Sequence, residues 1–180
     1  MTKDIIDSSR IKLIPFGKEQ LTEDYLSWLN DKETMRYSDQ RFKNHSMESC
    51  REYWKSFNDS PNEFWAIIYK NEGHNKHVGN LTITIDPIHL DADISILIGN
   101  RNVWGKGLGL EAWNAMIKYL FEKKQIEKVT AGTLITNKAM LKIMQKSKML
   151  DDGIKRKHCI FEGRRVDMVY VALFRDKHRK

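Results

Sequence analysis

"NVWGKGLGLEAW", residues 102–113, carries three of the ten glycines in the chain, at positions 105, 107 and 109. An apolar pattern with helical spacing begins directly after them. Glycine permits unusual backbone angles and close approach, although it costs conformational entropy. Successive backbone amides at the start of a helix can also bind an anion. The stretch therefore predicts either a tight structural turn or a loop that approaches a phosphate group.

The glycine spacing excludes two common nucleotide-binding motifs. The segment lacks the Gly-Lys-Ser/Thr ending of a P-loop. Its G-x-G-x-G spacing also differs from the G-x-G-x-x-G of a dinucleotide-binding fold. The main-chain donors of the loop and the positive end of the helix dipole are the remaining reasons to expect an anion there.

Length and composition favour one ordinary domain that spans residues 1–180. Hydrophobic residues make up 41% of the chain and charged residues 31%. No apolar run approaches the ~20 residues of a membrane span, and the first residues lack the apolar core of a signal peptide. The two cysteines, Cys50 and Cys159, have neither disulfide-framework nor zinc-site spacing. We therefore expect a cytoplasmic protein with no metal and no membrane partner.

The net charge of +7 is unevenly distributed, because residues 138–180 contain 13 basic and 5 acidic residues. Such a segment could contact nucleic-acid phosphates or a phosphorylated small ligand. A solvated basic surface explains it more simply, and we favour that interpretation over a nucleic-acid partner.

Hydrophobic periodicity predicts an α+β fold in the order β-α-α-β-β-β-α-β-α-β-β, with a mostly antiparallel sheet and one strand–loop–helix–strand crossover. Ser46 is the expected N-cap of the second helix. The expected strands are 10–15, 63–70, 77–85, 93–99, 126–134 and a 157–174 hairpin turning at Glu162–Gly163, and the expected helices are near 21–29, after 46, 109–121 and 137–147.

These motifs resemble, in order and over nearly the whole chain, the GNAT superfamily of acetyl-CoA-dependent N-acetyltransferases, and specifically its ribosomal-protein-acetyltransferase-like (RimJ/RimL-type) branch. The superfamily motif Gln/Arg-x-x-Gly-x-Gly/Ala corresponds to residues 104–109, with tryptophan at the first position. The opening segment "IKLIPFGKEQLTEDYLSWLNDKETMRYS", the segment "NKAMLKIMQKSKM" and the closing "FEGRRVDMVYVAL" resemble the branch as well. The resemblance implies a GNAT-like sheet with helices on both faces.

The resemblance also implies which residues bind acetyl-CoA as co-substrate. Backbone amides of the glycine loop would hold its diphosphate, the strand before the loop would bond the pantetheine arm, and Asn137 would contact that arm or serve as an N-cap. The implied cofactor-binding residues are Ile96, Leu97, Ile98, Trp104, Gly105, Lys106, Gly107, Leu108, Gly109 and Asn137.

Four positions on and after the segment 137–147 depart from the family pattern. Met144 stands where many members have a tyrosine that protonates the leaving thiolate, Met140 replaces a serine, and Lys148-Met149 replaces Gly-Phe. The acid for the leaving group is therefore unassigned, although these residues fit helix packing.

For the chemistry, we expect Asp93 to act as general base, since it lies close to where some members carry a catalytic glutamate. A turn-forming role is the alternative. Acceptor-binding candidates are Tyr37, Ser38, Gln40 and Arg41, together with His89. A small amine such as an amino-sugar nucleotide is favoured over a protein N-terminus, and a non-catalytic CoA-binding protein is the alternative from another class. The oligomeric state does not follow from the sequence.

Overall fold

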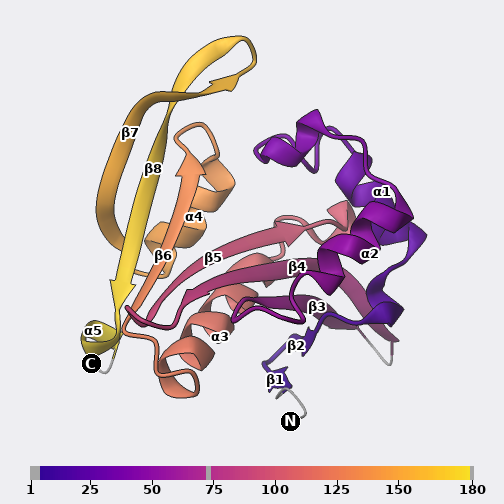
Figure 1. Ribbon diagram of the computed structural model, residues 1–180, viewed down its shortest axis with the longest axis horizontal. Coiled ribbons are helices and arrows are strands. Elements are labelled where there is room, and N and C mark those ends of the chain that lie inside the picture. The colour runs from indigo at the N-terminus through magenta and orange to yellow at the C-terminus, as the bar shows by residue number, and fades with distance from the viewer. Residues whose placement is uncertain (1–4, 72–73, 179–180) are drawn as a thin grey trace.

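The computed structural model describes residues 5–71 and 74–178 (Figure 1). Eight strands form one sheet in the order β1-β2-β3-β4-β5-β6-β8-β7. The strands are β1 (Ile6–Asp7), β2 (Ile11–Pro15), β3 (Glu63–Asn71), β4 (His74–Asp86), β5 (Asp91–Ile98), β6 (Lys128–Leu134), β7 (Leu150–Phe161) and β8 (Arg164–Phe174). The helices are α1 (Glu23–Asn30), α2 (Met47–Lys55), α3 (Leu108–Glu122), α4 (Lys138–Lys146) and α5 (Arg175–His178), with 3-10 turns η1 (Lys18–Gln20), η2 (Asp39–Phe42) and η3 (Arg101–Val103).

The predicted α+β order is confirmed, with additions at both ends of the chain. The short strand β1 and the one-turn helix α5 were not expected. Strand β7 begins at Leu150, seven residues before the predicted start of the hairpin at position 157. The sequence did not predict these residues as a strand because their charged run shows no apolar alternation. Ser46 caps α2 as predicted, with its side chain accepting the amide of Ser49.

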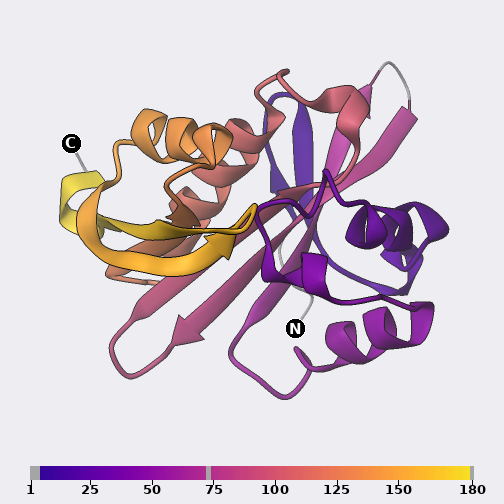
Figure 2. The same ribbon diagram turned by 90° about the horizontal axis from the view of Figure 1, so that it is seen from above.

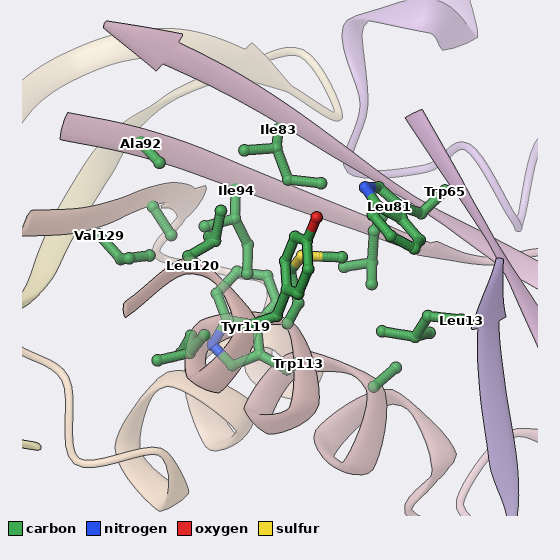
Figure 3. Close-up of a cluster of buried hydrophobic side chains, with 14 of the residues drawn as sticks. Leu13, Trp65, Leu81, Ile83, Ala92, Ile94, Trp113, Tyr119, Leu120 and Val129 are labelled. Atoms are coloured by element: carbon green, nitrogen blue, oxygen red, sulfur yellow. The ribbon is translucent and has the colours of Figure 1, made fainter. Parts of the chain in front are cut away.

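Helices cover both faces of the sheet, as expected. Figure 1 shows α1 and α2 on one face and α3 on the other. On the α3 face, the predicted apolar side of the helix packs on the central strands, and Trp113 and Leu120 lie against side chains of β4, β5 and β6 (Figure 3). On the opposite face, Tyr25 and Trp28 of α1 join Phe64 of β3 in a smaller cluster. Among the residues described, no helix combines the length and apolarity that crossing a membrane requires.

The functional consequence of the topology lies between β5 and β6. They are the parallel pair of the sheet, joined through α3, and they pair only from Asp91↔Lys128 to Asp93↔Thr130. Beyond this point they diverge, β5 following β4 and β6 following β8 (Figure 1). The sheet is therefore open along the second half of β5.

Helix α1 is fixed over the end of β5 by close packing on a glycine. The ring of Trp28 lies so near Gly99 that a Cβ on this residue would fall 2.0 Å from the Cδ2 atom of the tryptophan. Glycine is thus required at position 99 for contact between the helix and the strand.

Candidate active site

The open edge of β5 presents main-chain groups that have lost a neighbouring strand. The amide of Gly99 donates to the carbonyl of Val78 on β4 at 2.9 Å. Because peptide groups alternate along an antiparallel strand, Leu97 and Ser95 also direct their peptide groups toward β4. The peptide groups of Ile94, Ile96 and Ile98 consequently face the opening. Of the predicted arm-binding residues, Ile96 and Ile98 lie with their backbone toward the opening, whereas the backbone of Leu97 pairs with β4.

The glycine loop follows directly at the end of β5. Gly105 and Gly107 have φ values of +75° and +80°, which L-residues with a side chain rarely adopt. Gly107 is the N-cap of α3 and provides no capping side chain. Within the described residues, no acceptor takes the amides of Leu108, Gly109 or Leu110. These donors and the positive end of the 15-residue helix α3 form a site suited to an anion.

Two side chains anchor this loop. The indole Nε1 of Trp104 donates to the carbonyl of Ile98 at 2.8 Å. On the other side, Arg10 donates from Nη1 to the carbonyl of Lys106 at 2.8 Å and from Nε to Glu111 Oε2 at 2.8 Å. Burial alone would raise the pKa of Glu111, but hydrogen bonds from Arg10 and Ser8 lower it below its usual value. Sequence reasoning missed Arg10, which lies 96 residues from Lys106 in the chain.

Asp93 lies where the two strands separate. Its side chain is exposed on the sheet face opposite α3, and its Oδ2 accepts a hydrogen bond from Thr130 Oγ1 at 2.9 Å. Surrounding protein atoms raise the pKa of this carboxyl by removing solvent from part of it, while the bond from Thr130 lowers it. The net effect is a raised pKa, which makes Asp93 a better proton acceptor than an ordinary aspartate.

The segment after α1 and the β7–β8 hairpin meet on the same side of the sheet as α1 (Figure 2). Tyr37 stacks on Phe161 with ring centroids 5.2 Å apart and an interplanar angle of 11°. Arg36 pairs with Glu162 at the hairpin turn, and Arg41 Nη2 donates to the carbonyl of Ile160 at 2.9 Å. We call this set of contacts the bridge.

Of the residues predicted to bind the acetyl acceptor, the structure brings those of the 37–41 segment together and places His89 apart from them. Tyr37 and Arg41 belong to the bridge, and the guanidinium of Arg41 also bonds the carbonyl of Ser38 at 2.8 Å. Ser38 itself caps η2 by accepting the amide of Gln40 at 3.2 Å. His89 is exposed in the β4–β5 turn, at the opposite end of β5 from the glycine loop. No contact joins His89 to the bridge within the described part of the chain.

The profile of the acetyltransferase (GNAT) domain matches residues 10–150, well over half of the chain. The chain belongs to the GNAT acetyltransferase family. Solved structures of the same fold include a spermidine N-acetyltransferase from Vibrio cholerae in complex with CoA and spermine, at 17% identity and a TM-score of 0.84 over 96% of this chain and 100% of that one.

Two further solved structures share the GNAT fold. RimL, a ribosomal L7/L12 alpha-N-protein acetyltransferase in complex with coenzyme A, has 15% identity and a TM-score of 0.82 over 95% of this chain and 98% of that one. A GNAT-family acetyltransferase from Bacillus anthracis has 21% identity and a TM-score of 0.80 over 96% and 99% of the two chains. At these identities the likeness establishes the fold alone.

The GNAT positions on α4 have structural roles here. Asn137 is the N-cap of α4: its Oδ1 accepts the amide of Met140 at 3.2 Å, and its Nδ2 donates to Thr133 at 3.1 Å. Met144 is 2% exposed within the core under α3. Ile143 of α4 and Ile98 of β5 both lie beside Gly109, with side-chain atoms 3.4 Å and 3.5 Å from where a Cβ on that residue would lie. Of the departures from the family pattern, Met144 and Met149 are buried in the core and Met140 packs against it, whereas Lys148 is exposed.

Proposed function

We propose that this chain is an N-acetyltransferase that moves an acetyl group from acetyl-CoA to a primary amine by direct attack, with both substrates bound together. The observation that carries the proposal is the line of main-chain groups along the open edge of β5, where Ile96 and the amide of Ile98 face away from β4 beyond the last pair with β6, followed by the amides at the start of α3. An extended arm with amides, ending in a diphosphate, matches this line in both chemistry and order.

The length of the opening also fits the arm. Pantetheine spans about twelve bonds from its phosphate oxygen to its sulfur, the length of roughly four residues of extended chain. With the diphosphate on the amides at the start of α3, four residues back from Ile98 along β5 reach Ile94. The thioester would therefore lie beside Asp93. Arg10 and Lys106 add positive charge next to the diphosphate.

The acceptor must lose a proton before it can attack. An alkylammonium has a pKa near ~10.4, so its neutral form costs roughly 4–5 kcal/mol at pH 7. Asp93, with its raised pKa and its exposed side chain, would accept this proton directly or through a water. The amide of Ile96 faces the opening and would donate to the oxyanion that develops on the carbonyl.

The bridge supports a small acceptor. It joins the α1 segment to the β7–β8 hairpin by a ring stack, an ion pair and a side-chain-to-backbone bond, on the face where Asp93 is exposed. An extended protein N-terminus would need this face clear, whereas a small amine needs only local space. Amino-sugar nucleotides and polyamines are the acceptor classes to test first.

The test has two measurements. Calorimetric titration with CoA should show binding at one site, and this binding should persist without an amine. Thiol release from acetyl-CoA should then depend on the amine, with a panel of an amino-sugar nucleotide, spermidine and a synthetic N-terminal peptide. Turnover with the peptide alone would overturn the small acceptor, binding without turnover would indicate a CoA-binding protein, and no binding would overturn the proposal.

A further inference from the structure

The leaving thiolate of CoA needs a proton, and the α4 position that supplies one in many relatives cannot do so here, because Met144 has no acidic proton and is 2% exposed. Water or a hydroxyl elsewhere on the protein would have to supply this proton, and a hydroxyl could reach the opening from the face on which Asp93 is exposed. Strand β8, which pairs with β6 on the side away from β5, presents one.

The strand register places Tyr170 on this face. Asp93 pairs with Thr130, and Thr130 is two residues before Gly132, so both β6 residues project to the same side as Asp93. Gly132 is paired directly with Tyr170. Directly paired residues project to the same face of a sheet. The half-buried Tyr170 therefore shares a face with Asp93, on the other side of β6.

The ring of Tyr170 leans over β6 because position 132 is a glycine. A Cβ on Gly132 would fall 2.9 Å from Cε1 and 3.1 Å from Cδ1 of Tyr170, and 3.0 Å from the methyl carbon of Met168. A Cβ at position 132 would therefore force the tyrosine ring and the methionine methyl group to shift. The glycine thus opens a path across the strand for the tyrosine ring, and the opening between β5 and β6 borders that strand.

The hydroxyl of Tyr170 has a weak partner at rest. It donates to the thioether sulfur of Met168 at 3.4 Å, and no oxygen or nitrogen acceptor is recorded for it within the described residues. A thioether is a poor acceptor, so the bond is readily exchanged for a stronger one. Lys155 of β7 has its Nζ 5.1 Å from the ring centroid. Asp93 projects to the same face across β6, and so does Lys128 of β6, which pairs with Asp152.

We propose that Tyr170 is the general acid that protonates the departing sulfur of CoA. The inference rests on the proposed function, which places the thioester level with Ile94. Beyond the last pair, Asp93↔Thr130, Ile94 and Ser95 line one side of the opening, and Ala131 and Gly132 line the other. The sulfur would thus lie beside the residue over which Tyr170 leans, and it would take the place of Met168 as the acceptor of the phenolic hydrogen.

The step balances without any further reactant. The amine nitrogen forms a bond to the acetyl carbon, and the carbon–sulfur bond breaks. The sulfur takes the proton of the Tyr170 hydroxyl, which gives the free thiol and a phenolate. The proton that Asp93 removed from the ammonium group returns through solvent to the phenolate. The nitrogen releases its second proton to solvent as it becomes an amide, so one proton leaves per turnover and both side chains regain their starting state.

The experiment compares Tyr170→Phe with the wild type and with Tyr53→Phe, a control on α2 whose ring is 45% exposed. Calorimetry gives the affinity for CoA, and steady-state assays give kcat and KM over a pH range. Tyr170→Phe should lower kcat about 100-fold and leave CoA affinity and the amine KM within twofold. Tyr53→Phe should match the wild type.

A second variant tests whether the position of the Tyr170 hydroxyl matters and not only its presence. Gly132→Ala keeps Tyr170 but displaces its ring, so it should lower kcat while CoA affinity confirms the fold. Unchanged kcat in Tyr170→Phe, or a raised amine KM with kcat retained, would overturn the acid role and leave the proposed function intact. Absence of CoA binding or amine-dependent thiol release in the wild type would overturn both.

Discussion

The indole Nε1 of Trp104 donates a hydrogen bond to the carbonyl oxygen of Ile98 at 2.8 Å, and this bond connects the glycine loop to the open edge of β5. The two residues carry the two halves of the proposed acetyl-CoA site. Arg101, with its guanidinium 5.5 Å from the Trp104 ring, lies 3.9 Å from Asp31 at the end of α1, so the same loop is also connected to the helix that covers the acceptor face.

Trp104→Phe should weaken CoA binding about fivefold. The change removes one hydrogen bond, which typically contributes ~1 kcal/mol, and the ligand would then have to order the loop. Trp54→Phe is a matched control. The Nε1 of Trp54 also donates to a backbone carbonyl, that of Phe16, at a distance of 2.9 Å, but this bond is not part of the glycine loop. Calorimetric titration should show unchanged affinity in the control, and equal losses in both variants would contradict a specific role for Trp104.

Gly105→Ala should lower CoA affinity by about tenfold, equivalent to ~1.4 kcal/mol. Gly105 has a φ of +75° and open space around its Cα, and Gly163 at the hairpin turn has a φ of +76° and equally open space. Alanine at either position should cost roughly 1–2 kcal/mol of unfolding free energy. Only Gly105→Ala should affect CoA binding, and similar affinities in the two variants would exclude the loop from the site.

Asp93→Asn should lower kcat/KM at least ~100-fold while CoA affinity is retained, because the amide cannot accept the proton of the ammonium group. In the wild type, kcat/KM should rise with pH through the raised pKa of Asp93, since only the carboxylate is a base. Thr130→Val removes the hydrogen bond that lowers this pKa. The rising limb of the pH profile should therefore move to higher pH, and a limb that moves lower or stays would argue against Asp93.

His77 should make the protein less stable in mild acid. Burial lowers the pKa of this imidazole, although hydrogen bonds to Asn80 and Gly79 oppose the effect. Both partners are acceptors, at 2.8 Å and 3.0 Å, so Nε2 carries the proton, and the buried Nδ1 has no partner among the residues described. The folded state thus favours neutral His77, whereas the unfolded chain binds a proton below pH ~6.5.

The contribution of His77 to the free energy of unfolding should consequently be constant above that pH and fall as the pH decreases through ~6.5 toward the lower folded pKa. His77→Gln should flatten this decrease, because glutamine does not titrate there. His89→Gln, at an exposed turn, should leave it unchanged. Urea denaturation at pH 7.5 and 5.5 measures the effect, and an equal pH dependence in His77→Gln and the wild type would contradict it.

Much of the fold could be predicted because its elements have strong local signals. Alternation along 77–85, helical spacing after Gly109 and the turn at Glu162–Gly163 each depend on neighbouring residues, and the structure confirms all three. Strand β7 was underestimated because an edge strand with solvent on its faces needs no apolar alternation. For the site, the glycine loop and Asp93 could be found by motif and position, whereas Arg10, Phe161 and Tyr170 have no local signal.

By itself, the sequence determined the order of strands and helices, the helix that begins at the glycines and the apolar sides that form the core, since these follow from local geometry and from burial of apolar surface. Only the tertiary structure decided that β5 and β6 separate after Asp93 and that Tyr170 leans over Gly132. Tertiary packing also placed Arg41 in the bridge, where its guanidinium bonds the carbonyl of Ile160. These features join residues far apart in the chain, and their geometry depends on how strands pair and side chains pack, which no local pattern records.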